Sequence, residues 1–343
     1  MVSKGYGESL VLGTQTPRQL NNMARKYTAD ELIQLVRDEA RIPDTAATGN
    51  ADADILNRIN ETLSSYLYGM VMEVKEEYFL RTVRQELSDS EERYKIPARA
   101  MYQKLRDLKW AETATSGYSP LAHINIGDLD DRYSSLDTND FPSGFYVEGN
   151  HVHLWPDQAG SKGFLDMSFY FAPGDLVLQA STAKVVGITD GVVEIDSVPT
   201  GWVADETDYD IHSPDSGAEI RCWEKGATLH IGTKKLTFTS TDVDGSNVGD
   251  DPVEVGDYVC LTNEAALPGV PRELHPTVAK LAAAQILEDE GDVEGFQAKT
   301  ALSDRELYGY KRSMGALGRM ENRVEAKPRF IRGGNFLDAQ GGW

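Results

Sequence analysis

Nearly all of the negative charge of this chain lies in its middle. Residues 112–264, called the acidic segment below, contain 27 Asp and Glu against 7 Lys and Arg, a net charge of −20. The whole chain of 343 residues carries −21. The spacing of apolar residues changes at the same borders, from helical periods on both flanks to alternation in between. We therefore predict an α+β protein in which an acidic β domain is inserted into a helical frame.

Length and charge limit the classes of partner. A chain of this length can form two domains with a sizeable core. The carboxylates of the acidic segment repel phosphates, which argues against binding of nucleic acid or anionic lipid there. The start of the chain lacks an apolar signal region, and the longest apolar run, near Leu281–Leu287, is too short to span a bilayer. We expect a soluble protein that is made in the cytoplasm and does not enter a membrane.

Two helices are predicted before the acidic segment. Thr28 and Glu31 form the sequence pattern of a capping box, and Pro43 ends the first helix. The second helix is predicted from Asp52 to about Leu80, a rod roughly 40 Å long at 1.5 Å per residue. Such a long rod suits a helical bundle or a subunit interface. Its apolar face includes three candidates for inter-subunit contacts: Tyr66, Met70 and Val74.

Within the acidic segment, short strands joined by turns are predicted. Phe145 to Trp155 reads as a hairpin around Gly149 and Asn150, and Val185 to Ile195 as a hairpin around Asp190 and Gly191. A third pair runs from Leu229 to Phe238 around residues 232–235. Several such hairpins favour an antiparallel sandwich or barrel.

Helices return after the acidic segment. Pro276 suits the first turn of an alanine-rich helix, and Gly291 suits its end. The next helix carries a heptad seam at Phe296, Thr300, Ser303, Leu307, Tyr310, Met314 and Leu317. Two interpretations of the seam stay open: one helix face packed on the local core, or an inter-subunit contact made by Phe296, Leu307, Tyr310 and Met314.

The C-terminal tail is basic and aromatic. Residues 311–332 contain seven Lys and Arg against two Glu, a net charge of +5. The tail is interpreted either as a frayed terminus or as an arm that becomes ordered on another protein. The aromatic side chains favour the arm. Its proposed contact residues are Lys311, Arg312, Arg319, Arg323, Arg329, Phe330, Ile331, Arg332, Phe336 and Trp343.

No motif in the sequence indicates catalysis or a cofactor. Walker, GxSxG, HExxH and GxGxxG patterns do not occur. His151 and His153 have a spacing that metals accept, but the sequence offers no third ligand. In the acid-rich loop that begins at Asp242, glycine stands at the fourth position rather than the sixth, so a solvated loop is favoured over a calcium site. We expect no enzyme, metal or cofactor.

The two cysteines suggest no framework of disulfides or zinc. Cys222 and Cys260 both fall in strand-like stretches, and no CxxC pair exists. Buried free thiols are expected, and a disulfide between the two is the alternative.

The order of the pieces resembles that of tailed-bacteriophage head-to-tail adaptors, also called connector or head-completion proteins. The resemblance rests on the helix pair within residues 28–80 and on three sequence stretches. These are Tyr94-Lys-Ile-Pro-Ala-Arg-Ala-Met-Tyr-Gln-Lys-Leu-Arg106, Phe145-Tyr-Val-Glu-Gly-Asn-His-Val-His-Leu-Trp-Pro156 and Pro268-Gly-Val-Pro-Arg-Glu-Leu-His-Pro276. The last leads into the alanine-rich helix and Gly291-Asp-Val-Glu-Gly295.

The resemblance implies a structural virion protein at the neck. Such proteins form a ring, usually of twelve copies, between the portal protein and the tail or nozzle protein. Genomic DNA passes through the ring without sequence-specific binding, and the C-terminal segment grips the portal. The large acidic segment and the N-terminal extension depart from the shortest members of the family.

A second hypothesis is a cell-envelope (peptidoglycan) hydrolase or a carbohydrate-binding module, with the acidic β domain as its working part. Exposure of Trp155, Trp202 or Trp223 on one sheet face would favour it, because sugars stack on exposed aromatic rings. A pair of carboxylates at the separation that glycosidases use would carry little information, since the segment contains so many acids.

The expected organisation has five parts. They are an N-terminal arm (1–27), an N-terminal helical part (28–111), an acidic β domain (112–265), C-terminal helices that pack with the N-terminal ones (266–317) and an extended C-terminal arm (318–343). In a ring, charges of −20 per copy at a small radius would repel one another across the Debye length of about 8 Å. We therefore expect the β domains to lie outward and apart, with the near-neutral helices forming the ring contacts.

Overall fold

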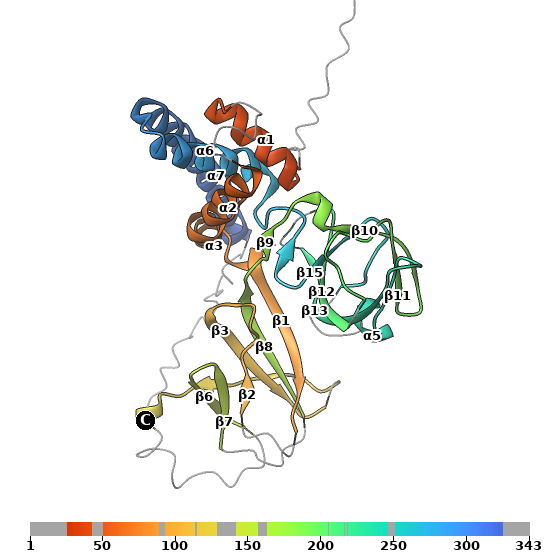
Figure 1. Cartoon of the computed structure of the whole chain (residues 1–343). Coiled ribbons are helices and arrows are strands. Elements are labelled where there is room, and N and C mark those ends of the chain that lie inside the picture. The colour runs from red at the N-terminus through yellow and green to blue at the C-terminus, as the bar shows by residue number, and fades with distance from the viewer. Residues whose placement is uncertain are drawn as a thin grey trace, which may run out of the picture.

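The computed structural model shows a mixed α+β protein with a group of helices, two open sheets and a closed barrel (Figure 1). It describes residues 26–42, 51–88, 93–113, 115–128, 142–156, 163–204, 206–215, 217, 219–245 and 251–324. The helices lie at one end of the molecule, the open sheets at the other, and the barrel beside them (Figure 1).

The first helix begins as predicted. In α1 (Ala29–Ala40) the Thr28 hydroxyl accepts the Glu31 N–H at 3.4 Å, and the Glu31 carboxylate accepts the Thr28 N–H at 3.1 Å. These two bonds satisfy backbone donors that a helix start leaves unpaired, so the predicted capping box is confirmed. The helix ends at Arg41, which adopts the left-handed conformation with φ of 59°.

The second predicted helix is shorter and less regular than expected. Its pieces are α2 (Asp52–Thr62), a π-helical turn (Leu63–Leu67) and α3 (Tyr68–Val74). Lys75 leaves the helix, and a 3-10 turn then leads into β1 (Leu80–Glu86). The prediction of one rod to Leu80 is therefore wrong for its last turns, because the chain turns there to enter a sheet.

Two C-terminal helices complete this part of the molecule. The helix α6 (His275–Asp289) has Pro276 in its first turn, and Gly291 follows it with φ of 80°, as predicted. The last helix, α7 (Val293–Val324), runs past the predicted end at Leu317. The helices share one apolar core, which we call the helical core and to which Ile59, Leu67, Val278, Ala282 and Leu307 contribute.

A second core lies between two four-stranded sheets. One sheet has the order β1-β8-β3-β4 and the other the order β2-β7-β6-β5. Their strands are β2 (Tyr94–Lys95), β3 (Ala100–Ala111), β4 (Ser119–Pro120), β5 (Ala122–His123), β6 (Gly144–Glu148), β7 (His151–Trp155) and β8 (Phe164–Phe171). The predicted hairpin around Gly149 and Asn150 is confirmed as β6 and β7, with Glu148 paired to His151.

The β structure begins earlier than the expected border at residue 111. Both β1 and β3 lie within residues 28–111, which the sequence pattern assigned to a helical part. They pair on either side of β8, which comes from the acidic segment. This sheet therefore contains strands from before and after residue 111, where the border between domains was expected.

The third core fills a closed barrel of six strands in the order β10-β11-β14-β13-β12-β15. The strands are β10 (Ala183–Thr189), β11 (Val192–Ile195), β12 (Glu206–His212), β13 (Ile220–His230), β14 (Lys235–Thr237) and β15 (Tyr258–Leu261). The hairpin around Asp190 and Gly191 is confirmed, and both residues have positive φ, as a type I′ turn requires. Pairing of Leu229 with Leu236 confirms the third predicted hairpin.

Two short parallel strands connect the barrel to the helices. They are β9 (Asp175–Leu176) and β16 (Glu264–Ala265). Leu176 belongs to the helical core, and the Asn60 side-chain amide bonds both its carbonyl (3.0 Å) and its N–H (2.8 Å). Because α1–α3 and α6–α7 share one core, the chain between them is an insertion that leaves the helices near residue 80 and returns near residue 265.

One buried histidine gives the helical core a dependence on pH. His275 accepts the Tyr27 N–H at Nδ1 (3.2 Å), and its Nε2 lies 3.3 Å from the Val270 carbonyl, so the neutral ring satisfies both contacts. Burial lowers the pKa of His275 from 6.5 to about 4. Between these two pH values the unfolded chain binds a proton that the folded protein excludes, so the stability from this group is present above pH 6.5 and is lost as the pH falls.

We expect the free energy of unfolding attributable to His275 to drop by about 2 kcal/mol between pH 7.5 and pH 5. Urea unfolding of the wild type and of His275→Asn at both pH values measures it. The Asn side chain can still accept the Tyr27 N–H but does not titrate, so its loss should be smaller by that amount. Equal losses in the two proteins would contradict the assignment.

Candidate interaction surfaces

The predicted heptad seam packs mostly inside its own chain. Leu307 is buried in the helical core, and Phe296 and Tyr310 are half-buried against it. Polar bonds add to this contact, since Glu306 of α7 accepts the Thr277 hydroxyl of α6 at 3.0 Å and also binds Lys280. Leu307, Phe296 and Tyr310 therefore pack on the local core, which was one of the two interpretations of the seam.

The three residues of the second helix that were predicted to contact another subunit differ in exposure. Met70 is buried in the helical core and Val74 packs half-buried against it, whereas Tyr66 is 48% exposed. Tyr66 lies in the π-helical turn, where the Ser64 and Ser65 hydroxyls bond carbonyls of the preceding turn. Of the three, Tyr66 is the side chain that a neighbouring molecule could contact without rearrangement.

A groove of about 620 Å³ runs beside the exposed end of the seam. Tyr310, Ser313 and Met314 of α7 form one wall, and the chain after α3 forms another. The full lining is Lys75, Tyr78, Asp215, Pro271, Arg272, Glu273, Tyr310, Ser313 and Met314. Burial and the nearby Tyr78 and Glu273 raise the pKa of Tyr310 to about 12, so its ring keeps its proton at neutral pH. The groove combines an apolar wall with charged groups of both signs.

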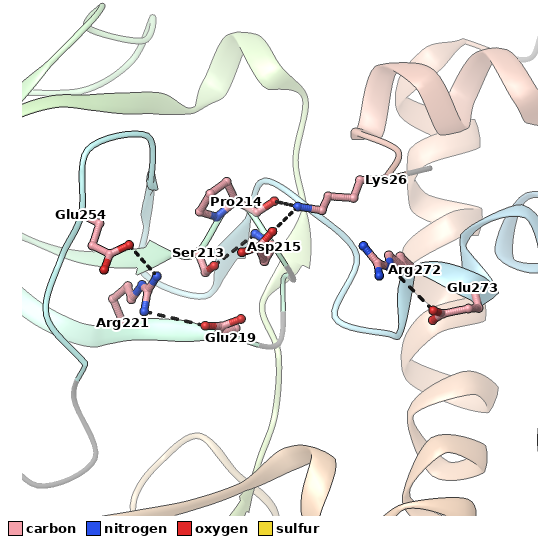
Figure 2. Close-up of polar contacts among 9 residues, drawn as sticks. All are labelled: Lys26, Ser213, Pro214, Asp215, Glu219, Arg221, Glu254, Arg272 and Glu273. Atoms are coloured by element: carbon pink, nitrogen blue, oxygen red, sulfur yellow. Dashed lines mark hydrogen bonds and ion pairs between the residues drawn. The ribbon is translucent and has the colours of Figure 1, made fainter. Parts of the chain in front are cut away.

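Figure 2 shows how the barrel is attached at the edge of this groove. The Lys26 ammonium donates to the Pro214 carbonyl at 2.9 Å and to the Asp215 carboxylate. These two contacts join the chain before α1 to a loop of the barrel. Hydrogen bonding and the positive charge of Lys26 lower the pKa of Asp215. Nearby, Arg221 pairs with Glu254 at 3.3 Å, with Asp257 at 3.4 Å and with Glu219 at 3.7 Å. The two Lys26 contacts hold the loop against the helical part, whereas the Arg221 pairs lie within the barrel region.

A buried ion pair joins the barrel to the open sheets. The Arg99 guanidinium, just before β3, lies 2.7 Å from the carboxylate of Asp210 in β12; Arg99 is 4% exposed and Asp210 0%. Arg99 also donates to the Ala172 carbonyl at 3.0 Å. Asp210 accepts backbone N–H groups of Glu224 (2.9 Å) and Asn263 (3.1 Å). The pair is therefore supported by hydrogen bonds from three other segments of the chain.

Of the predicted arm, only the beginning lies within the described residues. Lys311 pairs with Glu73 of α3 at 2.7 Å, and Arg312 is exposed on α7. Arg319 and Arg323 lie on the last turns of α7 by their backbone. Arg329, Phe330, Ile331, Arg332, Phe336 and Trp343 lie outside the described residues.

The tryptophans named for sugar stacking are mostly internal. Trp202 is 7% exposed and packs on Tyr209 in the barrel core, and Trp223 is 8% exposed and packs on Phe171. Trp155 is half-buried. Trp202 and Trp223 thus offer no ring face to a carbohydrate.

The candidate metal and thiol sites are occupied by contacts within the protein. The His153 ring stacks on Tyr146 at 4.7 Å, and Asp242 pairs with Lys225 at 3.5 Å. Among the described residues, no group of three or more His, Cys, Asp or Glu is arranged to hold a metal ion. Cys222 and Cys260 are buried free thiols, as expected, and form no disulfide.

Comparison with known proteins adds no assignment. No family model matches the chain, and no curated protein matches it either. In the part of the chain that the structure describes, none of the helices is both long enough and apolar enough to span a membrane.

The Arg99–Asp210 pair can be compared directly with the exposed Lys26–Asp215 pair. We expect Asp210→Asn to lower the free energy of unfolding by about 3–5 kcal/mol, because it leaves a buried guanidinium without its counter-charge. Lys26→Ala is the matched control; Asp215 is 72% exposed, so the expected loss is at most about 1 kcal/mol. Urea unfolding monitored by tryptophan fluorescence measures both. A loss for Asp210→Asn no greater than that of the control would contradict the role given to the buried pair.

Proposed function

We propose that the chain is a structural virion protein of a tailed bacteriophage: a head-to-tail adaptor in the neck, between the portal protein and the tail or nozzle protein. Its copies form a ring, with twelve as the expected number. Genomic DNA passes through the ring without sequence-specific binding. The proposal assigns no catalytic step, cofactor or membrane contact to the chain.

One architectural observation carries the proposal. The helices that flank the insertion, α1–α3 and α6–α7, contribute to a single helical core, and the β modules project from it (Figure 1). Residues 29–74 and 275–324 together carry 17 Asp and Glu against 10 Lys and Arg, a net charge of −7, so the helices repel their copies less than the acidic segment would. Acidic modules held outward at a larger radius would repel one another less.

The course of α7 supports the role of the C-terminal arm. The helix continues from the helical core through Lys311 and Arg312, so the start of the basic segment is helical. A basic aromatic arm that follows a helix is well suited to capture a partner, since aromatic and arginine side chains contribute most strongly to interfaces. In the ring, this arm would grip the portal.

Truncation tests the proposal. A chain that ends at Val324 should stay folded and should no longer bind the portal ring of the same virus, because it lacks the arm. Removal of residues 1–25 is the matched control, and that variant should still bind. Electron microscopy of each protein mixed with portal rings, together with its thermal unfolding, measures both properties. Equal portal binding by the full-length and truncated chains would rule out the arm as the portal contact. If the full-length chain formed no ring of its own on the portal rings, the adaptor proposal would be ruled out.

A further inference from the structure

The strand β3 contains an extruded segment, Met101–Lys104, which we call the finger. Ala100 pairs with Phe171 and Leu105 pairs with Phe169, so the four finger residues stand opposite a single residue of β8. Tyr102 and Gln103 have φ of 56° and 53°. Two consecutive non-glycine residues in the left-handed region are rare, and a tyrosine there is an outlier for so bulky a side chain. Conformations of this kind cluster at functional sites.

The finger exposes an aromatic ring among basic groups. Tyr102 is 84% exposed, the highest value among the large hydrophobic side chains of the described residues. Lys104 and Arg106 next to it are also exposed, and Arg106 lies 3.6 Å from Glu76. An exposed tyrosine flanked by cations matches the composition of interface hot spots.

The barrel carries the opposite charge, and two of its exposed carboxylates, Asp190 and Asp244, lie at its far end. Residues 183–261 contain 16 Asp and Glu against 5 Lys and Arg, a net charge of −11. Asp190 is exposed at the tip of the β10–β11 hairpin, and the N–H of Phe238 bonds the Gly191 carbonyl, which brings the short helix α5 (Ser240–Val243) and the exposed Asp244 to the same end. We call this region the acidic end.

The finger and the acidic end face away from each other. In the first sheet, β8 separates β3 from β1, and the barrel lies on the β1 side with β11 and α5 at its far edge (Figure 1). One molecule therefore cannot bring the two together, whereas successive copies can. A contact between different patches of identical subunits is head-to-tail, and it generates a ring when the rotation closes.

We propose that the finger of one subunit docks on the acidic end of the barrel of the next subunit. The inference rests on the proposed ring and adds to it a contact between β modules. In this contact the basic residues of one copy attract the acidic barrel of the next, which offsets the repulsion between barrels. Charge complementarity within the chain favours a second copy over nucleic acid, since a protein with a net charge of −21 repels a polyphosphate.

Photo-cross-linking separates this contact from the ring itself. Benzoylphenylalanine replaces Tyr102 in one protein and the exposed Tyr308 of α7 in another, and the cross-linked peptides are mapped by mass spectrometry with duplex DNA present. We expect position 102 to cross-link to barrel residues near Asp190 of a second copy. Cross-links between copies from position 308 alone would overturn the finger contact and leave the ring. Cross-links between copies from neither position would overturn both, and a cross-link from position 102 to DNA would overturn the choice of partner.

A charge exchange tests the same contact without a probe. Lys104→Glu and Asp190→Lys should each weaken self-association by about tenfold, measured by sedimentation velocity, and the double variant should recover most of the loss. Arg41→Glu, an equal charge reversal at the end of α1, is the matched control and should have little effect. Circular dichroism confirms that each variant is folded. Lack of effect from Lys104→Glu, or of recovery in the double variant, would show that the finger only protects the edge of its sheet.

Discussion

The relative placement of the β modules depends on the buried pair between Arg99 and Asp210. The open sheets and the barrel each have an apolar core, and the two meet where Ile220 and Trp223 of β13 join the core of the open sheets. Apolar contact is tolerant of small shifts, whereas a buried guanidinium and carboxylate must meet in one geometry or leave charges unpaired. The ring of Phe171 lies 4.6 Å from the Arg99 guanidinium and further limits its position. The pair thereby converts two adjoining modules into one body with a defined shape.

A second constraint is the closure of the helical core around an insertion. The chain leaves this core after α3 and re-enters it before α6, so both ends of the β region are anchored at one place. Asn60 clamps Leu176, and Lys26 binds the loop at Asp215, which adds two attachments on that same side. Carboxylates lie on this side too, since Asp215, Glu219 and Glu254 surround these contacts (Figure 2).

Features that depend on neighbouring residues were predictable from the sequence. The Thr28 capping box, the three hairpins and the stop at Gly291 rest on turn and cap chemistry within a few residues, and the structure contains each of them. The strands β1 and β3 were missed. All but the last residue of β1 are half-buried, so it shows no alternation, and its partner β8 lies about 80 residues further along the chain. Tertiary pairing overrides local pattern in such strands.

The candidate surfaces show the same limit. A heptad seam indicates that a helix face is apolar but does not say which molecule covers it, and here the local core covers Leu307 and Phe296. The Arg99–Asp210 pair joins residues 111 positions apart, and among the many acids of the region no spacing distinguishes Asp210 as the partner. The sequence does not indicate the finger either. Positive φ is usually adopted by glycine or asparagine, and here the residues with positive φ are Tyr102 and Gln103.

The internal use of the seam changes where an assembly contact must be sought. Side chains buried in the helical core are unavailable to a neighbour unless the core opens, which would cost far more than a surface contact returns. In the proposed ring, contacts between copies must then come from side chains that the fold leaves outside, among them Tyr66, Tyr102 and Tyr308. Two of these lie on the helical part and one on the sheet. A ring with contacts on both the helical part and the sheet would be held at two radii. The outer contact would place a basic finger where the acidic barrels otherwise repel one another.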